Sequence, residues 1–102
     1  MKYDIKKLKK NDPATYDTAL AGYIYASYEQ LEKVFGKPHG KSSDGKTKAE
    51  WDLIINGKVV TIYDYKSSLP AKANVVWHIG GKTEGLPALL AKVTGFKTSR
   101  RL

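Results

Sequence analysis

The chain of 102 residues contains no cysteine and only two histidines. Without cysteine, the protein can form neither disulfide bonds nor thiolate metal sites. No apolar run approaches the roughly 20 residues that cross a bilayer. The first ten residues, "MKYDIKKLKK", lack the apolar segment of a secretory signal. These absences predict a cytoplasmic protein with no cofactor and no membrane partner.

Acidic residues are scarce relative to basic ones, and the formal net charge is +8. Residues 1–10 contribute +4, residues 97–101 contribute +3, and all other residues together contribute only +1. Basic ends that touch nucleic-acid phosphates fit this distribution, and so do frayed termini that keep the protein soluble. The candidate phosphate-binding residues of the two ends are Lys6, Lys7, Lys9, Lys10, Arg100 and Arg101.

Two segments carry helix signals. In "SYEQLEKVFGKP", Ser27 is the predicted N-cap, Gln30 is its capping-box partner, and Gly36 ends the helix. In "EGLPALLAKV", an apolar stripe predicts a second helix, with Thr83 as its cap and Gly95 at its end.

Strand signals surround these helices. "TALAGYIYA" and "VVWHI" are rich in aromatic and β-branched residues, and Gly80-Gly81 is expected to break the second of these strands. Asn56-Gly57 predicts the two-residue turn of a hairpin. The order of elements predicts an α+β domain, with a small, mainly antiparallel sheet of three or four strands and two helices packed on one face. The predicted boundaries are a basic, loosely held arm at 1–17, one domain at 18–95 and a basic tail at 96–102. A free sheet edge can pair with a second copy of the chain, so a homodimer is an open alternative.

The hairpin "AEWDLIINGKVVTIYDYK" contains Asp52, Asp64 and Lys66, which resemble the acids and lysine of a metal-dependent nuclease. With a two-residue turn, Ile55 pairs with Lys58, and the two aspartates fall on opposite faces, where they cannot share one Mg²⁺. A β-bulge would realign them, but neither strand contains a glycine to indicate one. We therefore expect no catalytic residue and no metal ligand, with an Mg²⁺-dependent nuclease as an alternative.

The same register places four candidate partner-binding residues on one face: Tyr63, Tyr65, Glu50 and Asp52. Aromatic side chains on a sheet can stack on bases or anchor a protein partner. The two acids favour a protein partner. His78 lies on a predicted strand, but the pattern of its neighbours does not decide on which face of the sheet its side chain lies.

"GGKTEG", residues 80–85, precedes a predicted helix. Backbone N–H groups there, with Lys82 and Thr83, are a second candidate phosphate site. The simpler interpretation is a strand-to-helix turn. With Trp77 as a stacking aromatic, this segment supports another alternative function, a protein that sequesters a nucleotide signal.

The segments "YIYASYEQLEKVFGKPHG", "KTKAEWDLII", "TIYDYK" and "WHIGG" together resemble a group of small accessory proteins encoded by bacteriophages. The likeness covers roughly residues 22–95, and in the group the position of Asp64 can be Asn. The resemblance implies a non-enzymatic protein of the host cytoplasm that inhibits a bacterial defence system. Its partner would be a defence protein or a nucleoprotein complex, as for an anti-CRISPR protein, and nucleic-acid phosphates would add to the contact.

Overall fold

The computed structural model describes residues 3–102, which form one six-stranded antiparallel sheet and two α-helices. The α+β class is confirmed, but the sheet has more strands than the three or four predicted. The order across the sheet is β1-β3-β4-β5-β2-β6. The strands are β1 (Ile5–Lys7), β2 (Ala19–Tyr25), β3 (Glu50–Ile55), β4 (Lys58–Tyr63), β5 (Val76–Gly81) and β6 (Lys97–Ser99). The helices are α1 (Tyr28–Phe35) and α2 (Leu86–Thr94), with short 3₁₀ helices η1 (Pro13–Thr15) and η2 (Ala71–Ala73).

The two additional strands come from the basic ends. β1 pairs with β3 and β6 pairs with β2, so each end forms an edge of the sheet. Both segments lie outside the predicted domain at 18–95, and each contributes a strand to its sheet. The physical reason is that the exposed edge of β3 or β2 offers unpaired backbone N–H and C=O groups, which the nearby chain end satisfies.

The hairpin register is confirmed. Ile55 pairs with Lys58, and the pairing continues without a shift to Glu50 and Tyr63. Asn56 and Gly57 both have positive φ angles, of 49° and 79°, as expected for the turn that matches the twist of two antiparallel strands.

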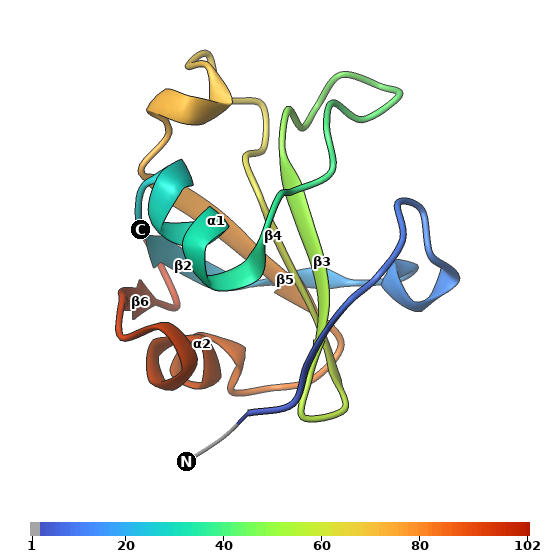
Figure 1. The fold of residues 1–102 in the computed structure, drawn as a ribbon, viewed down its shortest axis with the longest axis vertical. Helices are drawn as coiled ribbons and strands as arrows, with labels where there is room; N and C mark the ends of the chain where they lie inside the picture. The colour runs from blue at the N-terminus through green and yellow to red at the C-terminus, as the bar shows by residue number, and fades with distance from the viewer. Residues whose placement is uncertain (1–2) are drawn as a thin grey trace.

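One hydrophobic core lies between the sheet and both helices. In Figure 1, α1 stands in front of β2 and β5, and α2 lies below β6. Trp51 and Trp77 are buried there, with ring centroids 5.2 Å apart. The indole N–H of Trp51 donates to the backbone carbonyl of Gly36, and the indole N–H of Trp77 donates to that of Ala26. Because Trp77 occupies the core face, its neighbour His78 points to the other face.

The predicted capping box of α1 is present: Gln30 N–H donates to the Ser27 hydroxyl, and Ser27 N–H donates to the Gln30 side chain. The prediction for α2 is wrong at its start, because Gly85 precedes the first turn and no side chain caps it, Thr83 included. The expected break at Gly80-Gly81 is also wrong. Both glycines belong to β5, where a Cβ at Gly81 would collide with Leu86.

Candidate functional site

A row of aromatic side chains crosses the face of the sheet that the two helices leave free. Tyr23 on β2 pairs with His78 on β5, and His78 pairs with Tyr63 on β4. Residues directly opposite each other in antiparallel strands share a face. The ring centroids of Tyr63 and His78 are 5.3 Å apart with nearly parallel planes, and Tyr23 meets His78 edge-on at 5.1 Å. Tyr65, just beyond β4, lies 5.9 Å from His78. We call these four side chains the aromatic strip.

The aromatic strip is partly accessible to solvent. Tyr65 is 41% exposed, and the other three rings are half-buried. Burial lowers the pKa of His78 below its ordinary value, so this imidazole is neutral at pH 7. Burial, followed by the nearby Glu50 carboxyl, raises the pKa of Tyr63, so its phenol also stays protonated. The strip therefore presents neutral rings with polar tips.

The row continues into two acidic residues on β3. Glu50 pairs with Tyr63, and Asp52 pairs with Thr61. Burial, a hydrogen bond with Asp52 and the charge of Asp52 raise the pKa of Glu50 to about 8. At neutral pH, Glu50 is therefore protonated and can donate to Asp52. The Oδ1 atom of Asp52 has no hydrogen-bond partner among the described residues, and the Asp52 side chain is almost fully buried.

His39 lies beside Glu50 and Asp52, which we call the acidic pair. Its Nε2 atom lies 3.6 Å from Asp52 Oδ2 and 2.9 Å from the backbone oxygen of Leu8. His39 also forms a two-way backbone bridge with Glu50, so it extends the sheet at the edge of β3. A small cavity of about 70 Å³, lined in part by Lys10 and Thr15, separates the acidic pair from the N-terminal segment. Asp52 is therefore almost fully buried beside this cavity, whereas Glu50 remains partly exposed.

Two lysines flank the exposed rings. Lys66 Nζ lies 5.4 Å from the centroid of Tyr65, and Lys97 Nζ lies 5.1 Å from the centroid of Tyr25. Tyr25 is two residues from Tyr23 on β2 and shares its face. These distances are in the range of cation–π contacts. The strip therefore has a positive charge near Tyr65 and another beyond Tyr23.

The aspartates of the nuclease alternative do not form a metal site. Asp64 Oδ1 accepts hydrogen bonds from the backbone N–H groups of Lys48 and Ala49, at 2.8 and 3.0 Å, so this buried carboxylate holds the chain that enters β3. Asp52 turns toward His39 instead. Among residues 3–102, no group of three or more His, Asp or Glu side chains has a geometry that could hold a metal ion.

A separate cavity of about 940 Å³ lies beside the turn from β5 to α2. Lys82, Thr83 and Arg100, three of the predicted phosphate-binding residues, all line it. The lining also contains Asp17 and Glu84, which offset the two cations. Trp77 is fully buried and does not reach this cavity, so its predicted role as a stacking aromatic is wrong.

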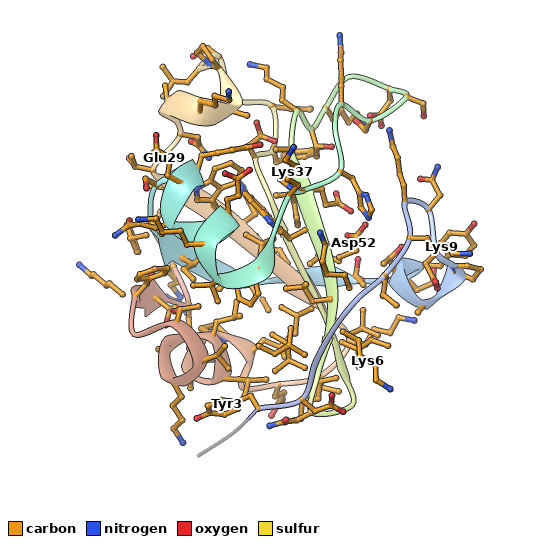
Figure 2. The ribbon with its side chains drawn as sticks, in the orientation of Figure 1. Tyr3, Lys6, Lys9, Glu29, Lys37 and Asp52 are labelled. Atoms are coloured by element: carbon orange, nitrogen blue, oxygen red, sulfur yellow. The ribbon has the colours of Figure 1, made fainter. Side chains whose placement is uncertain are left out.

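The remaining predicted phosphate-binding residues are divided between the two edges of the sheet. Lys6 and Lys7 lie on β1, and Arg101 follows β6 at the opposite edge. Figure 2 shows Lys6 and Lys9 on the side of the molecule away from the helices. Lys7 and Lys10 bind backbone oxygens of the loop that follows α1, those of Lys37 and Lys41. These two ammonium groups therefore help to hold the N-terminal segment in place.

The four predicted partner-binding residues lie near one another, but they differ in character. Tyr63 and Tyr65 belong to the accessible strip, whereas Glu50 and Asp52 form the acidic pair. Sequence reasoning missed His78 as a member of the strip. The alternation in "VWHIGG" would have placed it there once Trp77 was assigned to the core.

The chain was compared with protein-family models, curated proteins and solved structures, and it matches none of them. Within the part of the chain that the structure describes, no helix has the length and apolar character needed to cross a membrane.

Proposed function

We propose that the chain is a non-enzymatic binding protein that inhibits a bacterial defence system, as the phage accessory proteins that it resembles are expected to do. It acts in the host cytoplasm by occupying a surface of a defence protein or of a nucleoprotein complex, in the manner of an anti-CRISPR protein. The aromatic strip is the surface that makes this contact.

The observation that supports this proposal is the partly exposed row of rings on the free face of the sheet. Tyrosine is enriched among the residues that dominate binding energy at interfaces, because one ring combines a large apolar area with a polar tip. Tyr63 and His78 are fixed by pairing between strands, so they lose little further freedom when a partner binds.

The basic edges add a second contribution. Lys6 and Lys9 at one edge and Arg100 and Arg101 at the other are exposed. They can meet phosphates if the partner contains nucleic acid. Contacts of this kind weaken steeply with salt, whereas stacking and apolar contacts of the strip depend on salt much less.

A plating assay tests the proposal. The chain is expressed in a panel of bacterial strains that carry defined defence systems and in matched strains without them. We expect phage plating to rise on a defended strain and to stay unchanged on its undefended match. The double variant Tyr63→Ala/Tyr65→Ala should lose the effect, and the exposed Tyr16→Ala, outside the strip, should keep it. Unchanged plating across the whole panel would contradict the anti-defence role.

The large cavity favours a second candidate function, the sequestering of a nucleotide signal. Its volume of about 940 Å³ is in the range of small-molecule sites. Lys82 and Arg100, from different parts of the chain, both line it. A nucleotide that copurifies with the protein, and is lost from Lys82→Ala/Arg100→Ala, would support this function. Protein that is free of nucleotide after purification from cells producing such signals would argue against it.

A further inference from the structure

The direction of the aromatic strip indicates what kind of partner fits it. The strip runs across the strands from β4 through β5 to β2, a distance of about 10 Å at the usual strand spacing. One basic edge lies beyond β3 and the other beyond β2. An extended polyanion that follows the rings would therefore pass from the lysines of β1 toward Arg100 and Arg101.

The acids on this face do not oppose such a ligand. The carboxyl of Glu50 is protonated at neutral pH because of its burial beside Asp52. Asp52 is 4% exposed and lies under the N-terminal segment, next to His39. The charges accessible near the rings are those of Lys66 and Lys97. With Glu50 protonated and Asp52 buried, the two acids leave an anionic partner of the strip possible.

We propose that the aromatic strip binds single-stranded nucleic acid, with bases packed against Tyr63, Tyr65 and His78 and phosphates near Lys66 and Lys97. This inference rests on the proposed function, because it names the partner class of the same surface. Bases of a single strand expose the faces that aromatic side chains stack on, whereas a duplex keeps them covered. Within a nucleoprotein defence complex, the ligand would be a guide or a displaced strand.

Fluorescence anisotropy on the purified full chain tests this inference. The probes are labelled single-stranded DNA and RNA of about 20 nucleotides, longer than the roughly 4–16 that a small domain occupies, and a duplex of the same sequence. We expect the single strands to bind more tightly than the duplex. Tyr65→Ala should weaken binding by about tenfold, since stacking on one ring contributes about 5- to 150-fold. Tyr16→Ala, which removes an exposed ring outside the strip, should leave binding unchanged.

A charge-matched pair of variants separates the strip from the total charge. Lys66→Ala/Lys97→Ala should reduce the salt dependence of binding more than Lys33→Ala/Lys92→Ala, which removes two exposed lysines from the helices on the other side of the sheet. All these positions are exposed, so each variant is expected to fold, and circular dichroism checks that it has.

Two results would overturn the inference. One is the absence of single-strand binding at low salt, and the other is equal weakening by the strip variants and by their matched controls. The proposed function is tested separately: a nuclease-resistant protein partner that is lost with the strip variants would support it, even if no oligonucleotide binds. Failure of both experiments would remove the strip as a recognition surface.

Discussion

The half-buried carboxyl of Glu50 makes the stability of the fold depend on pH in a specific direction. Its pKa rises from 4.5 to about 8 on folding, first because of burial and then because of Asp52. Between these two values the folded chain holds a proton that the unfolded chain has released. The contribution of Glu50 to stability is therefore greatest below about pH 4.5 and declines as the pH rises to about 8.

The size of this decline follows from the pKa change. The full shift corresponds to about 5 kcal/mol. Because the Glu50 side chain is partly exposed, solvent screens it, and we expect about 2 kcal/mol. Glu50→Gln cannot take up the proton, so its free energy of unfolding should lack this decline.

Urea unfolding, followed by the fluorescence of the buried Trp51 and Trp77, measures the effect. The relevant quantity is the difference in unfolding free energy between the wild type and Glu50→Gln from about pH 5 to about pH 9. Titration of groups that do not interact with Glu50, such as His78, cancels in that difference. Glu84→Gln removes an exposed carboxyl and is the matched control. Parallel pH profiles for the wild type and Glu50→Gln would refute the reasoning.

Three further changes test the packing around the two faces of the sheet. Gly80→Ala should lower the free energy of unfolding by about 1–3 kcal/mol, because its Cβ would lie 2.5 Å from Thr61 Oγ1; thermal unfolding measures this, and an unchanged melting temperature would contradict it. Leu31→Ala, at a fully buried position of α1, should cost about 2–5 kcal/mol, compared with a much smaller loss for the exposed Val34→Ala in urea unfolding. Asp64→Ala should lower the free energy of unfolding by about 1–3 kcal/mol, because it leaves two backbone N–H groups without an acceptor. Asp64→Asn keeps an acceptor oxygen and should lower that free energy less. Equal losses for the two variants would show that the hydrogen bonds are not the cause.

Local signals in the sequence predicted the elements whose geometry is set by neighbouring residues. The capping box of Ser27 and Gln30 depends on contacts within one helical turn. Asn56-Gly57 fixes both the turn and the register of the hairpin. That confirmed register is the one that places Asp52 and Asp64 on opposite faces of the sheet.

The edges of the sheet could not be predicted in this way. β1 and β6 have three residues each and no alternation of apolar and polar side chains, so their pairing depends on the edges offered by β3 and β2. Such short, lysine-bearing edge strands are poor templates for another chain. The prediction that an edge pairs with a second copy stays a prediction.

The character of the candidate site depends on contacts between distant segments. Glu50 and Asp52 are two residues apart, and the sequence indicates two surface carboxylates. Their burial is produced by His39 and the N-terminal segment, which no local pattern connects to β3. Likewise, Lys82 and Arg100 meet at one cavity only because β6 packs beside β2 and α2.

The most direct test of the central claim is affinity capture from bacterial lysate, with and without nuclease treatment. Wild-type chain, Tyr63→Ala/Tyr65→Ala and the control Tyr16→Ala serve as baits, and mass spectrometry identifies what each retains. We predict a stoichiometric partner that the wild type and the control retain and that the strip variant loses. Equal retention by all three baits would contradict the claim that the aromatic strip is the recognition surface of this protein.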